Sequence, residues 1–266
     1  MPETHLQIEK YFFWLVIYSV IGWVYESILE TYRQKKLVNR GFLNGPYCPI
    51  YGSGALLDVV VLGWIENPVL LFLASAVLTC TLEYITSVIL EKIFHIRWWD
   101  YNDFKFQLHG KEINMGKFNI NGRICLVGAI AFGTLSIVIL KVIHPIMEIL
   151  TNNLSVPLFH YVCIGLLVLI MIDITFTVSG LVGFNEKLKN LSTSIIQITN
   201  GFKDSLDNKV QLISAREKIN SLYEKFAKSL NFQQIRLFHA FSQLRSIDYG
   251  KITDELKKFV FRRKKK

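Results

Sequence analysis

Five long apolar stretches constrain the fold of this chain more than any other feature of its 266 residues. A helix needs about 20 apolar residues to cross the hydrocarbon core of a bilayer. With 51% hydrophobic residues, the chain is also too apolar for an ordinary soluble domain. The sequence therefore predicts an all-α, polytopic membrane protein with about five transmembrane helices. We place these helices near 11–32, 47–65, 69–90, 124–143 and 157–184.

The second stretch is the least regular of the five. It begins at Pro46 and Pro49, and it contains Gly52, Gly54 and Asp58. Proline and glycine both weaken a regular helix, and the apolar run itself is short. We therefore expect either a tilted transmembrane helix or a re-entrant hairpin.

Charge divides the chain into two parts. Residues 1–184 hold 12 Lys and Arg against 13 Asp and Glu, a net of −1, whereas residues 185–266 hold 18 against 8, a net of +10. The formal net charge of +9 thus belongs to the tail. We expect a helical transmembrane domain over 1–184 and a basic, amphipathic helical tail over 185–266.

The loops between the predicted spans indicate an orientation. Lys and Arg gather in the loops near 33–46 and 91–123, whereas the loops near 65–68 and 144–156 contain neither residue. Basic loops mark the cytoplasmic side of a membrane protein. The pattern predicts an amino terminus outside and a carboxyl terminus in the cytoplasm.

Apolar residues of the tail recur at helical spacing from Leu188 onward, with breaks expected at Asn200-Gly201, Asn231 and Asp248-Tyr249-Gly250. We expect two or three helices that pack together, dimerise or lie on the membrane. The basic end at 262–266 is expected to attract anionic lipid. No nucleic-acid reader motif accompanies these charges, so membrane lipids rather than nucleic acid are the expected partners, and a homo-oligomer is left open.

Charged side chains also occur where the predicted spans meet the cytoplasm. In the predicted topology, Glu26 and Glu83 lie in the cytoplasmic ends of the first and third spans, and Arg40 and Arg123 lie in the adjoining loops. A charge within the hydrocarbon costs about 2.5 kcal/mol or more, so such residues persist when they are paired, hydrated or used. We expect the two carboxylates and two guanidinium groups to lie at nearly one level.

Two interpretations of these groups remain open. In the first, Glu–Arg ion pairs hold the helices together. In the second, the groups line a cavity that binds a polar or anionic headgroup, or an ion. The glycine-containing loops favour the second interpretation, because non-helical backbone at membrane depth is expected where it lines a wet cavity or is buried in protein. The candidate substrate-binding residues are Glu26, Arg40, Asn44, Glu83, Asp100, Asn121 and Arg123.

Three aspartates need separate interpretations. Asp100 follows Trp98-Trp99, an aromatic pair typical of headgroup level, and we expect it to cap the next helix or to accept from Arg123. Asp58 and Asp173 lie deeper, within the second and fifth stretches. Each is expected either to form a hydrogen bond to another helix or to have a proton-coupled role.

No motif for catalysis or cofactor binding occurs in the sequence. A Walker lysine loop, HExxH and GxSxG are all missing, and no Cys or His spacing suits zinc. We predict no catalytic residue, metal ligand or cofactor, and the question of enzymatic activity stays open with the balance against it. The four cysteines are expected to be small buried residues.

Four segments resemble one known family over roughly residues 10–180. They are Val38–Gly52 (VNRGFLNGPYCPIYG), Leu82–Ser87 (LEYITS), Trp98–Tyr101 (WWDY) and Phe118–Leu126 (FNINGRICL). In this order they are similar to the Putative ABC-transporter type IV permease family of bacterial membrane proteins. The tail segment Arg236–Phe241 (RLFHAF) also resembles the carboxyl-terminal segment of some members. The resemblance implies a multi-span protein of the bacterial cytoplasmic membrane, and it does not by itself establish transport or energy coupling.

One departure from the family pattern lies between the third and fourth segments. In the family, WWDY is followed closely by FNxNGR, whereas here residues 104–117 form an added segment. If this loop shapes a site, the specificity of this chain is expected to differ from that of other members.

The sequence thus favours a permease-like membrane protein that binds or passes a polar or lipid-linked substrate near the cytoplasmic leaflet. The ABC resemblance implies a separate ATPase, or another membrane subunit, as a partner. Two alternatives remain. One is a membrane-embedded lipid-modifying enzyme with Glu26 or Glu83 as general base, and the other is a scaffold or regulator that acts through the tail.

Overall fold

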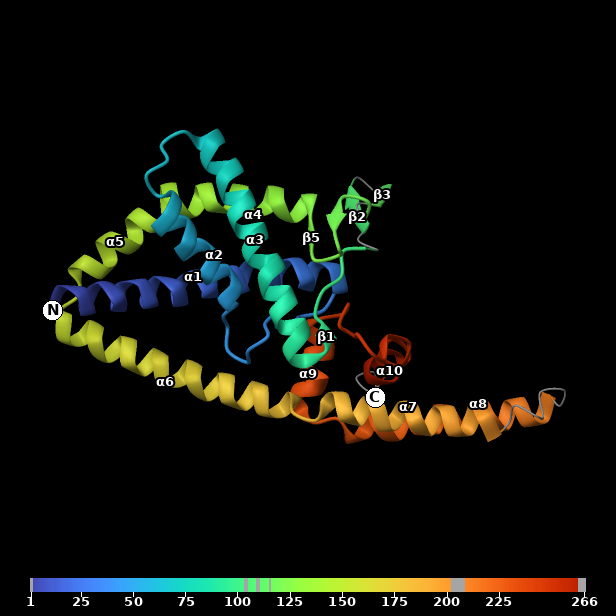
Figure 1. The fold of residues 1–266 in the computed structure, drawn as a ribbon. Coiled ribbons are helices and arrows are strands. Elements are labelled where there is room, and N and C mark those ends of the chain that lie inside the picture. Colours follow the sequence, from blue (N-terminus) through green and yellow to red (C-terminus); the bar gives the residue numbers. More distant parts are fainter. Residues whose placement is uncertain (1, 103–104, 109–110, 115, 202–208, 263–266) are drawn as a thin grey trace. The chain divides into compact units, whose positions relative to one another are not determined.

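Figure 1 shows the computed structural model, which describes residues 2–102, 105–108, 111–114, 116–201 and 209–262. The chain forms two compact units. The first unit combines Met1–Ile89 with Asp100–Phe176, and the second combines Leu90–Trp99 with Thr177–Lys266. The division of function between a membrane domain and a tail stays a prediction.

Helices make up most of the first unit. They are α1 (Pro2–Gln34), α2 (Pro49–Leu57) with the π-helical turn η1 (Asp58–Leu62), α3 (Pro68–Phe94), α4 (Leu126–Val138) with the π-helical turn η2 (Ile139–Ile143), α5 (His144–Asn153) and α6 (Val156–Leu181). Two short antiparallel ribbons join α3 to α4. They pair β2 (Lys105–Leu108) with β3 (Lys111–Asn114), and β4 (Asn119–Ile120) with β5 (Ile124–Cys125).

Among the described residues, four helical segments are long and apolar enough to cross a membrane. They are Thr4–Gln34, Pro68–Phe94, Leu126–Asn153 and Val156–Gly201. Large apolar side chains remain exposed on their outer faces; on α6, for example, Leu169 is 63% exposed and Ile172 is 62% exposed. Lipid tails can cover such a face, whereas water cannot do so without cost. The predicted all-α polytopic architecture is confirmed.

The second apolar stretch forms a helix over only Pro49–Leu62. At 1.5 Å per residue this helix is about 21 Å long, which is too short to cross the hydrocarbon alone. It begins beside the middle of α1, where the Cys48 amide donates to the Ser19 carbonyl oxygen at 2.8 Å. Residues 35–48 therefore return along α1 as non-helical chain before α2 begins.

Glycines allow α1 and α2 to approach each other closely. A Cβ atom on Gly52 would lie 2.2 Å from the Leu15 carbonyl oxygen, and a Cβ atom on Gly22 would lie 2.2 Å from the Tyr51 Cβ. Small residues let the backbones of membrane helices pack in contact. Gly52, which makes the second stretch look irregular in the sequence, thus allows it to fit against α1.

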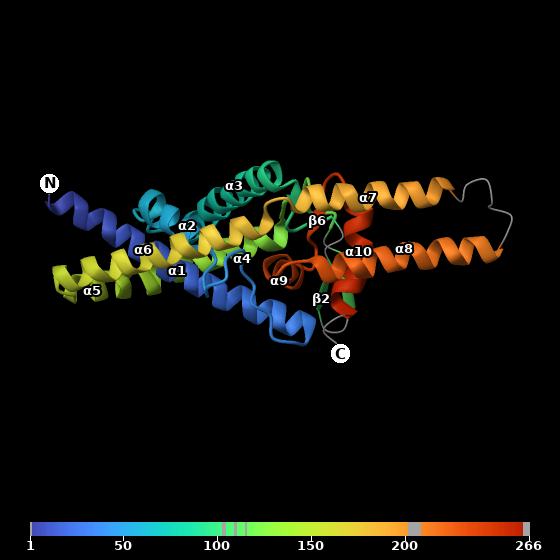
Figure 2. The same cartoon turned by 90° about the horizontal axis from the view of Figure 1, so that it is seen from below.

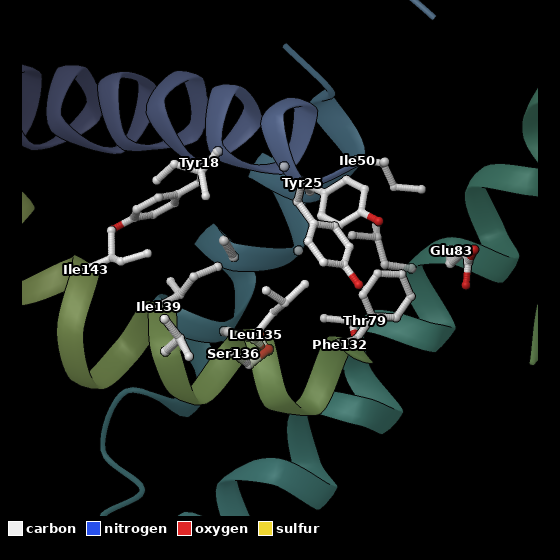
Figure 3. Close-up of a pocket in the computed structure, with 18 residues that line it drawn as sticks. Tyr18, Tyr25, Ile50, Thr79, Glu83, Phe132, Leu135, Ser136, Ile139 and Ile143 are labelled. Atoms are coloured by element: carbon white, nitrogen blue, oxygen red, sulfur yellow. Dashed lines mark hydrogen bonds between the residues drawn. The ribbon is translucent and has the colours of Figure 1, made fainter. Parts of the chain in front are cut away.

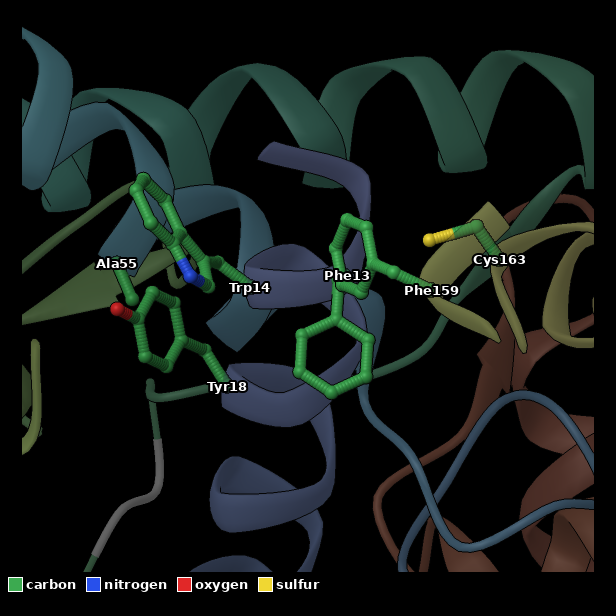
Figure 4. Close-up of a cluster of buried hydrophobic side chains, with 6 residues drawn as sticks. All are labelled: Phe13, Trp14, Tyr18, Ala55, Phe159 and Cys163. Atoms are coloured by element: carbon green, nitrogen blue, oxygen red, sulfur yellow. The ribbon is translucent and has the colours of Figure 1, made fainter. Parts of the chain in front are cut away.

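An apolar cluster closes the end of the first unit that holds the start of α1. Figure 4 shows Phe13, Trp14 and Tyr18 of α1 together with Ala55, Phe159 and Cys163. The Phe13 and Phe159 rings meet edge to face at 5.4 Å, a favoured geometry for aromatic pairs. This cluster fixes α1 against both α2 and α6.

The second unit is a set of packed helices and one small ribbon. Its helices are α7 (Phe184–Gly201), α8 (Lys209–Ser229), α9 (Phe232–Ala240) and α10 (Gly250–Arg262). Helices α7 and α8 lie side by side (Figures 1 and 2), and the Tyr223 and Phe259 rings of α8 and α10 stack at 5.4 Å. Strand β6 (Arg245–Ser246) pairs antiparallel with β1 (Ile96–Arg97).

Two of the predicted breaks in the tail are confirmed, since α10 begins at Gly250 and Asn231 caps α9. Helix α7 is described as far as Gly201, and residues 202–208, which follow the break expected at Asn200-Gly201, lie outside the described residues. The Asn231 side chain accepts from the Gln234 amide, and the Gln234 side chain accepts from the Asn231 amide, which is a capping box. The basic residues 263–266 and the apolar position 202 lie outside the described residues, as do 103–104, 109–110 and 115 in and beside the predicted insertion.

One sequence-based expectation is corrected here. Trp98 is only 3% exposed, and its ring meets those of Phe94 at 5.9 Å and Phe241 at 5.4 Å. It therefore belongs to the core of the second unit rather than to an aromatic belt at headgroup level. The two-tryptophan pattern alone does not distinguish these environments.

Candidate functional site

The non-helical loop 35–48 is fastened to α1 by polar contacts along its length. The Trp23 indole donates to Asn39 Oδ1 at 2.6 Å, and the Arg40 amide donates to Ser27 Oγ at 3.2 Å. The Cys48 thiol in turn donates to the Arg40 carbonyl oxygen at 2.9 Å. These contacts satisfy backbone groups that would be costly to leave unpaired within a membrane.

Glu26 and Arg40 meet where this loop passes α1. Arg40 Nε lies 3.4 Å from Glu26 Oε2, and the Tyr51 hydroxyl donates to Glu26 Oε1. Both carboxylate oxygens of Glu26 therefore have partners. The structure thus brings together one acid and one arginine that the sequence places at the same level.

Asn44 contacts a carboxylate that sequence reasoning left out of the site, that of Asp173 on α6. Asp173 Oδ1 accepts from the Asn44 amide at 3.0 Å and from Asn44 Nδ2 at 2.7 Å. Asp173 Oδ2 accepts from the Gly45 amide at 2.8 Å and from the Tyr47 hydroxyl at 2.6 Å. Hydrogen bonds to an ionised acceptor are about twice as strong as neutral ones. These four donors fix α6 to the loop.

Glu83 has a different environment. It is 6% exposed, and the Tyr101 hydroxyl donates to its Oε1 at 3.1 Å. Its other oxygen, Oε2, is buried and has no hydrogen-bond partner among the described residues. Burial raises the pKa of the Tyr101 phenol well above its ordinary value, and the Glu83 charge adds to the shift, so Tyr101 remains a donor. No arginine among the residues the structure describes forms an ion pair with Glu83.

Asn121 and Arg123 lie beside the neighbouring residue, Tyr84. The Asn121 side chain donates to the Tyr84 hydroxyl at 3.0 Å, and the Arg123 guanidinium lies 5.4 Å from the centroid of the Tyr84 ring. Asn121 and Gly122 have φ values of 53° and 69°, as a type I′ turn between β4 and β5 requires. The Asn-Gly sequence therefore shapes the turn that presents both side chains.

Asp100 packs against this turn. Its Oδ1 accepts from the amide and the side chain of Asn102 at 3.0 and 2.8 Å, and a Cβ atom on Gly122 would lie 2.4 Å from the same oxygen. The Tyr101 amide donates to the Gly122 carbonyl oxygen at 2.9 Å. The WWDY and FNINGR segments therefore form one structure that carries Tyr101 to Glu83.

A cavity of about 60 Å³ opens inside the first unit (Figure 3). Its walls come from α1, α2 with η1, α3, and α4 with η2, and Figure 3 shows Glu83 at one end with Tyr18 and Ile143 at the other. One water molecule needs about 10–15 Å³ of cavity volume measured in this way, so the cavity has room for about five waters. Of the predicted site residues, only Glu83 lines it.

The described residues contain no group of three or more His, Cys, Asp and Glu side chains that could hold a metal ion. All four cysteines are free and buried, as predicted.

A comparison with protein families supports the sequence resemblance. The family model described as Putative ABC-transporter type IV matches residues 13–116 and 112–178, and the two matched segments meet at the β2–β3 hairpin. The searches of curated proteins and of solved structures found no match. The matched segments cover more than half of the chain and include all the predicted site residues. This apolar, multi-helix chain is a membrane transporter-like protein and belongs to the Putative ABC-transporter type IV family.

Proposed function

We propose that this protein is a permease-like membrane subunit that binds a polar group of its substrate at Glu83. The observation that carries the proposal is the Glu83 carboxylate: it is buried in an apolar helix, it lines a cavity, and one of its oxygens has no hydrogen-bond partner in the part of the chain that the structure describes. An intramembrane carboxylate of this kind is costly, and proteins retain such groups for function.

The other predicted site residues support Glu83 in two ways. Glu26 with Arg40, and Asn44 with Asp173, have their polar atoms engaged with one another, so we assign them the role of holding the loop at membrane depth. Asp100, Asn121 and Arg123 shape the turn that carries Tyr101. In this proposal Glu83 and Tyr101 contact the substrate, and the others position them.

The cavity volume limits what fits in this conformation. A space for about five waters holds a small polar group but not a lipid headgroup. A larger polar or lipid-linked substrate therefore requires the helices that surround the cavity to separate. We propose that a separate ATPase subunit drives this step by docking on the basic loops or the tail. The charge distribution supports a cytoplasmic location for these segments, with the amino terminus outside.

The experiment compares strains that lack the gene and carry wild type, Glu83→Gln or Glu66→Gln. Glu66 is an exposed acid in the turn before α3 and serves as the matched control. Metabolites and lipids are profiled without a preselected target, and membrane abundance is measured by immunoblot. We expect Glu83→Gln to fail in reversing the deletion profile while its abundance stays near wild type. Full reversal by Glu83→Gln would refute the proposal.

The same profiles test the two alternatives. A lipid-modifying enzyme would change one class of lipid, and the purified protein would reproduce that change in vesicles. A scaffold that acts through the tail would lose its effect when residues 186–266 are deleted, with Glu83→Gln behaving as wild type. Glu26 is the weaker candidate for a general base, because Arg40 and Tyr51 already occupy its carboxylate.

A further inference from the structure

We propose that Asp58 and Glu83, with the hydroxyl groups between them, form a binding path for a small monovalent cation, a proton or Na⁺, inside the first unit. The inference deepens the proposed function by adding a coupling ion. It rests on that function in one respect, because both assign a ligand to Glu83. Asp58 is the new element, because it lies outside the set of predicted substrate-binding residues.

Asp58 is a buried carboxylate with an incomplete set of partners. It is fully buried at the start of η1 and lines the same cavity as Glu83. Its Oδ2 accepts from the Ser136 hydroxyl of α4. The hydroxyl of the equally buried Ser75 faces Asp58 as well, but outside regular hydrogen-bond geometry, so Oδ1 and this hydroxyl both keep bonding capacity among the described residues. Buried oxygens that receive no hydrogen bond are costly, and a bound cation or proton would satisfy them.

Helix α3 connects the two acids with a polar stripe. Ser75, Thr79 and Glu83 recur every fourth residue, are all buried, and therefore share one face of the helix. That face packs on α2, where a Cβ atom on Gly54 would lie 3.5 Å from the Thr79 methyl carbon. At 1.5 Å per residue, Ser75 and Glu83 are about 12 Å apart along the axis. The cavity is thus lined by two acids, Asp58 and Glu83, and by the hydroxyls of Thr79 and Ser136.

The charges around the cavity favour a cation over an anion. Among the described residues, those that line it include no Lys, Arg or His. Basic side chains near this part of the unit have other partners: the His144 ring bonds the Tyr18 hydroxyl at 2.9 Å, Lys141 donates to the Ile65 carbonyl oxygen at 3.2 Å, and Arg40 contacts Glu26. An anion would meet two carboxylates with no compensating charge. A cation or proton would neutralise them.

The groups that face each acid are consistent with this chemistry. Asp58 meets Ser75 of α3 and Ser136 of α4. Glu83 accepts from the Tyr101 hydroxyl, and the Tyr51 hydroxyl of α2 donates to Glu26 of α1. Glu26, Tyr51 and the thiols of Cys80 and Cys125 are close enough to Glu83 to interact with its charge. The described residues offer no cluster of three metal-ligating side chains, which Ca²⁺ and transition metals favour. A monovalent ion or a proton suits single carboxylates with hydroxyl neighbours.

Dicyclohexylcarbodiimide tests the proposal, because it reacts with protonated carboxyl groups in apolar surroundings. The full-length protein is purified, labelled between about pH 5.5 and pH 9, and mapped by peptide mass spectrometry. We expect Asp58 and Glu83 to be modified well above the exposed Glu66. Labelling should fall about tenfold per pH unit once the carboxyl groups are mostly ionised. Protection by Na⁺ but not by choline identifies Na⁺ as the cation, and pH dependence alone identifies the proton.

The proposal is overturned if neither acid is labelled above Glu66, or if labelling of both responds neither to pH nor to Na⁺. Asp58→Asn should abolish modification at residue 58, and size-exclusion chromatography checks that this variant folds. The test is separable from that of the proposed function. If the carbodiimide results fail while Glu83→Gln still loses its cellular effect, Glu83 binds substrate without a coupling ion.

Discussion

Replacing Asp173 tests whether the loop at membrane depth is held from α6. Its carboxylate accepts four hydrogen bonds from Asn44, Gly45 and Tyr47, two at each oxygen. Bonds to a charged group contribute about 1.5–3 kcal/mol each. Because Asp173 is only partly buried and water can replace some of these donors, we expect Asp173→Ala to lower the free energy of opening the loop by about 3–4 kcal/mol.

Asp173→Asn should have a smaller effect, for a reason visible in the geometry. The remaining amide oxygen can keep both bonds from Asn44, and the Tyr47 hydroxyl can rotate to accept from the new amide nitrogen. The Gly45 amide then faces a donor and loses its bond. One lost bond of this kind corresponds to about 1.5–3 kcal/mol.

Cys48 reports on the opening of the loop. Its thiol is buried, donates to the Arg40 carbonyl oxygen and lies at the loop's return to α1. Maleimide labelling of folded protein measures its exposure, with the modified cysteine identified by mass spectrometry. Each 1.4 kcal/mol of lowered opening energy is a tenfold rise in rate, so Asp173→Ala should label Cys48 about 100-fold or more faster than wild type.

Thr175→Val is the matched control for this experiment. Thr175 is an exposed residue of the same helix, and its hydroxyl bonds only to the Met171 carbonyl oxygen within α6. It should label Cys48 at the wild-type rate. The reasoning is refuted if Asp173→Ala changes that rate by less than about threefold, because the four hydrogen bonds would then contribute under 1 kcal/mol in total.

Two further substitutions test the packing of each unit. Gly52→Ala places a methyl group 2.1 Å from Ser19 Oγ, so it should separate α1 from α2 and lower the thermal midpoint in detergent by several degrees. The control is Gly165→Ala, whose added methyl group meets no atom within 4 Å and should leave the midpoint unchanged. Equal midpoints for the two variants would contradict the close approach of the helices. Trp98→Ala removes a 3%-exposed ring that packs on Phe241, so it should lower the free energy of unfolding of the second unit by about 3–5 kcal/mol. The second unit should then become sensitive to limited proteolysis, and a wild-type digestion pattern would disprove this expectation.

The sequence could predict the features that depend on local pattern. Apolar length predicts the long helices, and turn chemistry predicts the breaks at Asn231 and Gly250. The positions of Glu26 and Arg40 near one membrane face are also foreseeable, although their contact requires loop 35–48 to turn back along α1. These features require no knowledge of which distant elements touch.

The partner of Asp173 could not be predicted in this way. Asn44 and Asp173 are 129 residues apart, and their contact depends on the loop returning to the middle of α1 before α2 begins. Apolar periodicity carries no information about such a return. The one available signal was the Asn44-Gly45-Pro46 turn, whose amide groups need an acceptor at membrane depth. The burial of Trp98 was missed for the same reason, because its partner Phe241 lies in the tail.

The carboxylates of the first unit differ in how completely they are partnered, and this difference separates structure from function. Glu26 and Asp173 have partners on both oxygens, so their desolvation is offset and their loss should mainly destabilise the loop. Asp58 and Glu83 each keep one buried oxygen that makes no regular hydrogen bond within the described ranges. Substituting either acid by its amide removes a charge that the fold does not neutralise, so it should preserve or increase stability while abolishing binding. Glu83→Gln should therefore keep or raise the thermal midpoint, whereas Asp173→Asn should lower it. Measured side by side, these two shifts distinguish an acid that binds a ligand from an acid that fastens helices in this membrane protein.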